Sequence, residues 1–109
     1  MRLRDISGLL QDKMKRTRFL VCYDISHPKR LRQVAKILEG YGNRLQFSVF
    51  ECPLDKQRLA ELKSELLGIV HHEEDQILFV SLGQETSDDN VVIEALGLAY
   101  IGRTRLTII

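Results

Sequence analysis

Segments typical of strands and helices follow one another along this 109-residue chain in the order strand, helix, strand pair, helix, strand. That order predicts an α/β (α+β) fold, a ferredoxin-like βαββαβ sandwich. Two further features shape the prediction: the first strand stops at a single carboxylate, Asp24, and a surplus strand-like segment follows the last expected strand. We expect residues 1–17 to form an N-terminal extension and residues 18–109 to form one domain.

The first strand is expected to end at Asp24, because the five residues before it are aromatic, aliphatic or thiol. Such a run suits a strand that is buried on both faces. Asp24 then lies at the end of the strand and beside a helix start, where α/β folds bind ligands. It could instead cap the helix, but Ser26 is available as the cap, so we favour the functional interpretation.

Two amphipathic helices are predicted after this strand. Residues 28–39 carry apolar side chains at helical spacing, with a proline near the first position and Gly40 as the stop. Asp55 caps the second helix, residues 56–70, whose leucines lie on one face. A further short helix is expected within residues 1–14.

The remaining strands are predicted from runs of β-forming residues. Residues 43–52 form two short strands or one bent strand, and residues 76–82 form the last strand of the sheet. Residues 91–98 form a short element, and the alternating tail, residues 103–109, forms a strand with no place in a four-stranded sheet. We therefore expect a homodimer in which this extra C-terminal strand is added or exchanged across the two copies.

The formal net charge of +1 conceals a division between the two halves of the chain. Residues 1–50 contain eleven Lys and Arg against four Asp and Glu, whereas residues 51–109 contain five against eleven. A basic half around Asp24 is expected if one face contacts a polyanion, although ordinary solvated helix faces give the same composition. The basic residues flanking the first two strands and the first helix are Arg16, Arg18, Lys29, Arg30, Arg32 and Arg44.

The composition argues against several classes of protein. Apolar residues make up 44% and charged residues 28%, and no run approaches the roughly 20 apolar residues of a membrane span. The charged start lacks the apolar region of a secretory signal. Cys22 and Cys52 are far apart and are interpreted as buried thiols, so we expect a cytoplasmic protein.

Asp24 is the strand-end carboxylate of the basic half. A single carboxylate is usually too few protein ligands to hold a catalytic Mg²⁺. A homodimer that brings two Asp24 side chains to its axis would supply a second carboxylate and could hold one metal ion or a pair. Nearby arginines would position a phosphodiester backbone without reading its bases.

Two motifs resemble those of a known family, the small CRISPR-associated adaptation protein Cas2, a metal-dependent endoribonuclease. The first is the strand end at residues 21–26, followed by an arginine-rich helix start and the stop at residues 40–42. The second is the run of residues 44–51, and the acidic turn at residues 73–75 is also similar. The resemblance implies a ferredoxin-like homodimer, Mg²⁺ bound by an Asp at the dimer axis, and a place beside the CRISPR integrase in acquiring new spacers.

The resemblance also implies roles for single residues. Tyr23 and Asp24 correspond to the catalytic pair of the family, with Asp24 as the metal ligand. Together with the basic residues already described, the expected nucleic-acid contacts are Arg16, Arg18, Arg30, Arg32, Arg44, Ser48 and Phe50.

Three functions stay open at this point. One is a dimeric nuclease that acts on single-stranded RNA or on DNA through two Asp24 carboxylates and Mg²⁺. Another is a scaffold without catalysis that lays duplex DNA along its basic faces and joins integrase dimers. The third, by a related resemblance, is an mRNA-cleaving toxin of the virulence-associated D type, which shares the fold and the strand-end Asp.

Other tempting features are assigned no role in catalysis. The His-His-Glu-Glu-Asp run at residues 71–75 is expected to be a solvated turn, because consecutive histidines point in different directions. Phe47 is expected in the core, whereas Phe50 could fill the core or stack on a base. Asp88 and Asp89 lack a strand end and basic surroundings.

Overall fold

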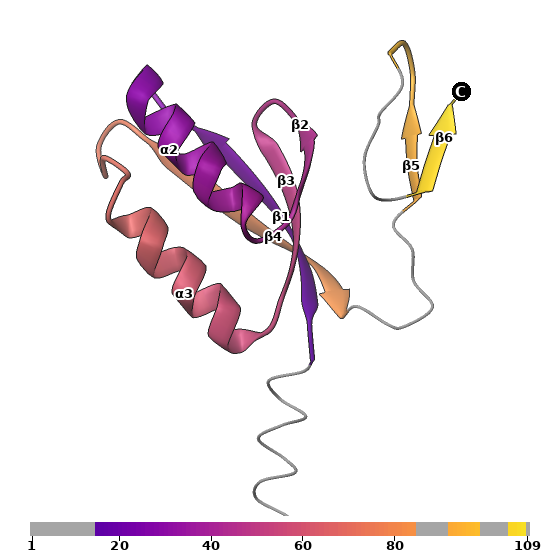
Figure 1. Ribbon diagram of the computed structural model, residues 1–109, viewed down its shortest axis with the longest axis horizontal. Helices are drawn as coiled ribbons and strands as arrows, with labels where there is room; N and C mark the ends of the chain where they lie inside the picture. The colour runs from indigo at the N-terminus through magenta and orange to yellow at the C-terminus, as the bar shows by residue number, and fades with distance from the viewer. Residues whose placement is uncertain (1–14, 85–91, 99–104, 109) are drawn as a thin grey trace, which may run out of the picture.

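The computed structural model describes residues 15–84, 92–98 and 105–108 of the chain. An antiparallel sheet with strand order β2-β3-β1-β4 carries two helices on one of its faces (Figure 1). This arrangement confirms the predicted ferredoxin-like fold. The elements are β1 (Thr17–Asp24), α2 (Pro28–Glu39), β2 (Asn43–Gln46), β3 (Val49–Leu54), α3 (Lys56–Leu67) and β4 (Gln76–Gln84). Within the described residues, no helix has the length and apolar character needed to cross a membrane.

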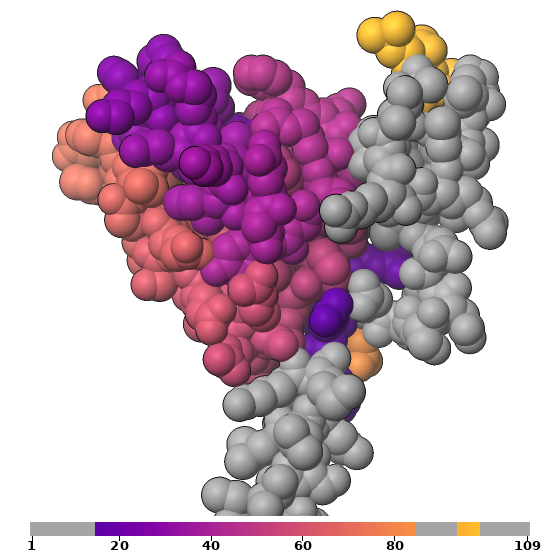
Figure 2. All heavy atoms as spheres, in the orientation of Figure 1, coloured from indigo at the N-terminus to yellow at the C-terminus, as the bar shows by residue number. Residues whose placement is uncertain are grey.

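The core is one layer of side chains between the helices and the sheet. Along β1, every second residue points to the helices, so Val21 and Tyr23 are buried whereas Leu20 and Cys22 are only half-buried. The expectation that β1 is buried on both faces is wrong, because both helices cover the same face (Figure 2). The core residues are Val21, Tyr23, Val34, Leu38, Phe50, Cys52, Leu54, Leu62 and Leu66.

Both helices begin and end at residues suited to capping. Helix α2 has the predicted bounds, but its N-cap is His27, whose Nδ1 accepts a hydrogen bond from the Lys29 amide at 3.1 Å. The predicted cap at Ser26 is therefore wrong. Asp55 caps α3 as predicted, by accepting a hydrogen bond from the Arg58 amide at 2.7 Å, although α3 ends at Leu67 rather than residue 70.

Gly42 lets the chain pass close to β3 before β2 begins. A Cβ atom at this position would lie 2.6 Å from Cys52 Sγ, 2.8 Å from Cys52 Cα and closer still to the carbonyl oxygen of Glu51. Backbone atoms cannot move aside without disturbing the pairing of β2 with β3.

We therefore expect Gly42→Ala to lower the free energy of unfolding by about 1–3 kcal/mol, the usual cost of overpacking. Urea unfolding measures this change. Gly40→Ala is the matched control, because its Cβ would meet nothing nearer than 3.3 Å and its φ of −78° suits alanine. Equal stabilities of the two variants would contradict the close approach at Gly42.

The C-terminal part of the described chain forms a separate two-stranded sheet. Strands β5 (Val92–Ala95) and β6 (Arg105–Ile108) pair in parallel with each other, and neither pairs with the four-stranded sheet (Figure 1). The predicted terminal strand thus exists, and its addition to a partner's sheet stays a prediction. The expected helix within residues 1–14 and the pair Asp88 and Asp89 lie outside the described residues.

Candidate functional site

Asp24 is the last residue of β1, and its side chain is exposed. Alternation along the strand places it on the face of the sheet that the helices leave open, where its residue partner on β4 is Gln76. It makes no hydrogen bond or ion pair with the part of the chain that the structure describes. Both carboxylate oxygens of Asp24 are therefore available to a cation or to water.

The loop after Asp24 is held by the carboxylate of Asp75, which lies just before β4. Asp75 Oδ1 accepts a hydrogen bond from the Ser26 amide at 2.9 Å, and Oδ2 accepts one from the His71 amide at 2.8 Å. The hydroxyl of Ser26 also donates to the carbonyl oxygen of Glu74 at 2.6 Å. These bonds fix the chain that leaves β1 to the turn between α3 and β4.

Arg30, on α2, also binds Asp75, and we call the group of Asp75, Ser26, His71 and Arg30 the Asp75 brace. Its Nε and Nη2 donate to the two oxygens of Asp75 at 2.8 and 3.2 Å, and Nη2 lies 3.5 Å from Glu74 Oε1. The Asp75 side chain has no exposed surface and that of Arg30 is 21% exposed. The Arg30 guanidinium thus pairs with a carboxylate of its own chain, Asp75. A contact of Arg30 with nucleic acid stays a prediction.

The hydrogen bond from Arg30 is the main reason that the pKa of Asp75 lies well below its ordinary value, and the His71 and Ser26 amides lower it further. A carboxyl group whose pKa is depressed on folding stabilises the fold above its unfolded pKa of about 3.9, and that contribution is lost as the pH falls toward the lower folded value.

We therefore expect the free energy of unfolding to decrease as the pH is lowered below about 4. Asp75→Asn should be less stable at pH 7 and should lose less of its remaining stability in acid. Urea unfolding at a series of pH values measures both slopes. If the free energy of unfolding of wild type and of Asp75→Asn changed equally with pH, Asp75 would not be the cause of the loss of stability in acid.

The turn between β2 and β3 is attached to the end of β1 through Tyr23. The Tyr23 hydroxyl donates to the carbonyl oxygen of Phe47 at 2.9 Å, and its amide donates to the carbonyl oxygen of Ser48 at 3.0 Å. Tyr23 is 5% exposed, and burial is the main cause of its raised pKa. Its side chain points to the helices, away from the open face that carries Asp24, and it holds the hairpin turn in place; a catalytic role of Tyr23 stays a prediction.

Arg44 joins the same turn from β2. Its Nη1 donates to the Phe47 carbonyl oxygen at 2.8 Å, and its guanidinium carbon lies 5.0 Å from the centre of the Phe50 ring. Its Nη2 is 3.8 Å from Glu39, and its side chain is 39% exposed. The structure thus brings three of the predicted nucleic-acid contacts, Arg44, Ser48 and Phe50, together beside Tyr23.

The two phenylalanines of this hairpin differ in their exposure to solvent. Phe50 is fully buried and contacts Tyr23 and Arg44 from the core, so its burial gives no support to the predicted contact with nucleic acid, which stays a prediction. Phe47, expected in the core, is 73% exposed.

The other predicted nucleic-acid contacts differ in exposure. Arg16 and Arg32 are exposed, whereas the side chain of Arg18 is 17% exposed and lies 4.0 Å from the buried Glu51. Arg16 and Arg32 are therefore better placed than Arg18 to contact a phosphate backbone.

The histidine-rich turn at residues 71–75 lies between α3 and β4. The rings of His71 and His72 stack at 5.6 Å with 6° between their planes, so the expectation that they point apart is wrong. Among the described residues, however, no three His, Cys, Asp or Glu side chains could together hold a metal ion. Residues 72–74 are exposed, as expected for a solvated turn.

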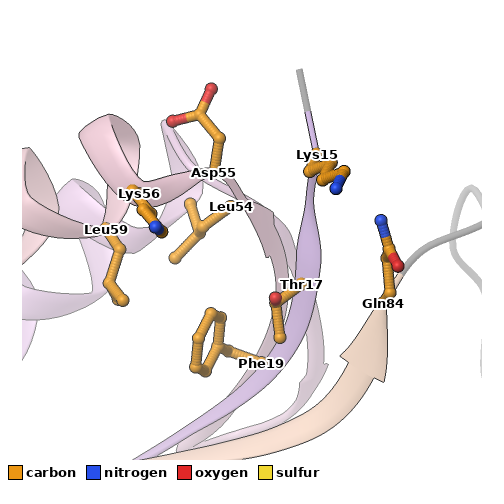
Figure 3. A pocket seen from close by; sticks show the side chains of 8 residues that line it. All are labelled: Lys15, Thr17, Phe19, Leu54, Asp55, Lys56, Leu59 and Gln84. Atoms are coloured by element: carbon orange, nitrogen blue, oxygen red, sulfur yellow. The ribbon is translucent and has the colours of Figure 1, made fainter. Parts of the chain in front are cut away.

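A cavity of about 250 Å³ lies at the opposite end of β1 from Asp24. Figure 3 shows the apolar side chains of Phe19, Leu54 and Leu59 on one side of it and Lys15 and Gln84 on the other. Asp55 borders the cavity but already caps α3.

Comparisons with known proteins show which sequences the chain is similar to. Residues 17–89 match the model of a family described as CRISPR associated protein Cas2. The chain is 42% identical over 82 residues to a CRISPR-associated endoribonuclease Cas2 of Rhodospirillum rubrum, covering 75% of this chain and 79% of that protein. It is also 42% identical over 69 residues to a CRISPR-associated endonuclease Cas2 of Halalkalibacterium halodurans, covering 59% and 72%.

Solved structures show the same fold. The crystal structure of a hypothetical protein, TT1823 from Thermus thermophilus, aligns with a TM-score of 0.62 at 29% identity over 70% of this chain and 93% of that chain. Streptococcus pyogenes Cas2 aligns with a TM-score of 0.58 at 41% identity over 61% and 86%.

Proposed function

Because the chain belongs to the CRISPR-associated protein Cas2 family, we propose that it is a metal-dependent endonuclease that acts with the CRISPR integrase in acquiring new spacers. The names endoribonuclease and endonuclease, carried by its relatives, support the class of reaction. The observation that carries the proposal is Asp24, an exposed carboxylate without a described partner, on a loop that Asp75 holds in place.

The open face of the sheet supports a homodimer. Leu78 and Val80 of β4 are 49% and 43% exposed on this face, next to the half-buried Leu20 and Cys22 of β1. Contiguous exposed apolar surface of this kind usually marks an interaction site. A second copy that covers the face around a two-fold axis would bring two Asp24 side chains toward each other.

The residues present fit Mg²⁺ as the cofactor. Mg²⁺ commonly keeps several waters and takes only one or two carboxylates from the protein, along with phosphate oxygens of the substrate. One exposed Asp24 from each chain of a homodimer supplies two carboxylates. When bound there, a divalent cation would activate a water and neutralise charge on the scissile phosphate.

Within the chain, each neighbour of Asp24 has a supporting task. Asp75 and Arg30 hold the loop that follows Asp24, and Tyr23 fixes the hairpin turn beside it. Arg44, on β2 beside that turn, is partly exposed and would pair with a phosphate near the scissile bond.

Binding of nucleic acid should depend on exposed arginines and fall steeply with salt, because neutralised phosphates release counterions. We expect the combined change of Arg16, Arg32 and Arg44 to Ala to weaken binding of all sequences alike. The slope of log affinity against log salt should fall by up to about three, or roughly one for each lost phosphate contact. Lys63→Ala, on α3, is the control. An unchanged salt slope would contradict backbone recognition.

The proposed activity is tested by incubating the protein with single-stranded RNA and with duplex DNA, with Mg²⁺ and after its removal by EDTA. Cleavage of one substrate that requires Mg²⁺ supports the proposal. Cleavage that survives EDTA, or no cleavage of either substrate, contradicts it.

A DNA-binding scaffold without catalysis is the second candidate, and the outer face of α2 favours it. Lys29, Arg32 and Lys36 are all exposed on that helix, and their spacing gives a basic stripe that suits a phosphate backbone. The match to the Cas2 family model supports either CRISPR function over the mRNA-cleaving toxin.

A further inference from the structure

Phe47 is an aromatic side chain that the fold leaves in solvent. It lies in the tight turn between β2 and β3 and is 73% exposed, whereas Phe50, three residues later, is fully buried. Phe47 adds nothing to the core, so its ring is free to bind something outside the chain.

The turn holds Phe47 in a fixed place. Its carbonyl oxygen accepts two hydrogen bonds, from the Tyr23 hydroxyl at 2.9 Å and from Arg44 Nη1 at 2.8 Å. Tyr23 is buried, and Arg44 lies over the buried ring of Phe50. The backbone of the turn is therefore held in place, so only the side-chain torsions of Phe47 have to be ordered when a flat partner binds against the ring.

Phe47 is also close to Asp24. The amide of Tyr23 bonds the carbonyl oxygen of Ser48, so the turn lies directly beside the end of β1, and Asp24 follows Tyr23 in the chain. Neighbouring strands are about 4.8 Å apart, and stacked nucleotides rise about 3.4 Å each. The backbone of the turn that carries Phe47 therefore lies about one strand spacing from the end of β1, which is comparable with the spacing of neighbouring nucleotides in a strand bound at Asp24.

We infer that Phe47 is a stacking platform for an unpaired base next to the scissile phosphate, and that it directs the site to single-stranded nucleic acid. This inference rests on the proposed function. Exposed aromatic side chains beside arginine are the common means of binding single strands, because every base has a flat face. The bases of a duplex are already stacked on one another, so the ring gains this contact only from a single strand.

The first experiment compares wild type, Phe47→Ala and Phe47→Trp in binding a 12-nucleotide single-stranded RNA and a 12-base-pair DNA duplex, in EDTA so that no cleavage occurs. The Ala variant should bind the single strand about 5- to 150-fold more weakly, the range expected when one stacked base is lost. Its affinity for the duplex should stay within about twofold of wild type, and Trp should restore binding of the single strand.

The second experiment uses fluorescence, because the chain contains no tryptophan. The indole of Phe47→Trp should be quenched when the single-stranded RNA binds and should change little with the duplex. Leu67→Trp is the matched control, because Leu67 is 75% exposed at the end of α3, and its fluorescence should respond to neither.

Three outcomes overturn the inference. One is an unquenched indole on a protein that still binds the RNA, and another is equal weakening of single-strand and duplex binding by the Ala variant. The third is a shift of Phe47→Ala toward monomer in sedimentation, which would assign the ring to contact with a second copy. If wild type binds neither nucleic acid, the proposed function fails together with this inference; the other outcomes leave that function standing.

Discussion

Replacing Asp24 by Asn is expected to reduce metal-dependent cleavage by roughly 10³-fold or more, as when a whole catalytic unit is removed. Asn keeps the size of the side chain and one carbonyl oxygen, but it removes the negative charge that Mg²⁺ requires. In a homodimer both chains carry the substitution, so both carboxylate ligands would be lost at once. Single-turnover cleavage of single-stranded RNA measures the loss.

The same variant should keep its fold and its affinity for nucleic acid. Asp24 is exposed and makes no hydrogen bond or ion pair with the described residues, and such surface changes usually alter stability by less than about 0.5 kcal/mol. Spacer integration together with the proposed partner, the CRISPR integrase, is the control. Integration without cleavage would assign the biological role to the scaffold, whereas unchanged cleavage would remove Asp24 from the catalytic site.

The second large effect is expected for Phe50→Ala, which should lower the free energy of unfolding by about 3–5 kcal/mol. Phe50 is fully buried, its ring centre lies 6.2 Å from that of Tyr23, and Arg44 lies over it. A domain of this size has about 5–15 kcal/mol of stability in total, so the variant should be close to unfolding. Urea or thermal unfolding measures the change.

Phe47→Ala is the matched control for this loss. The same side chain is removed three residues away, but from an exposed site, so stability should change by no more than about 0.5 kcal/mol. Similar destabilisation by the two variants would contradict the placement of the two rings.

The arrangement of helices and strands was predictable because its signals are local. The bounds of α2 follow from apolar spacing that ends at Gly40, and Asp55 caps α3 through an amide three residues away. The placement of Asp24 at the exposed end of β1 also followed from the apolar run before it. The two phenylalanines could not be placed in the same way. A turn at residues 47–48 separates β2 from β3 and restarts the alternation, so counting along one continuous strand assigns Phe47 to the wrong side.

The Asp75 brace was not predicted from the sequence, for a different reason. Its partners Arg30 and Ser26 are 45 and 49 residues away in sequence, and no local pattern joins them. The available signal was position: Asp75 comes directly before the strand that pairs Gln76 with Asp24. An acidic residue there is well placed to hold the loop that leaves β1, whereas composition alone made it one more charge in a solvated turn.

Cleavage by mixed dimers tests most directly whether two Asp24 carboxylates share the metal site. Dimers that contain one wild-type chain and one Asp24→Asn chain can be separated by different affinity tags and assayed with Mg²⁺ on single-stranded RNA. A shared site predicts that the mixed dimer is nearly as inactive as the dimer of two variant chains. Half of the wild-type activity in the mixed dimer, or full activity from a wild-type protein that sediments as a monomer, would contradict it.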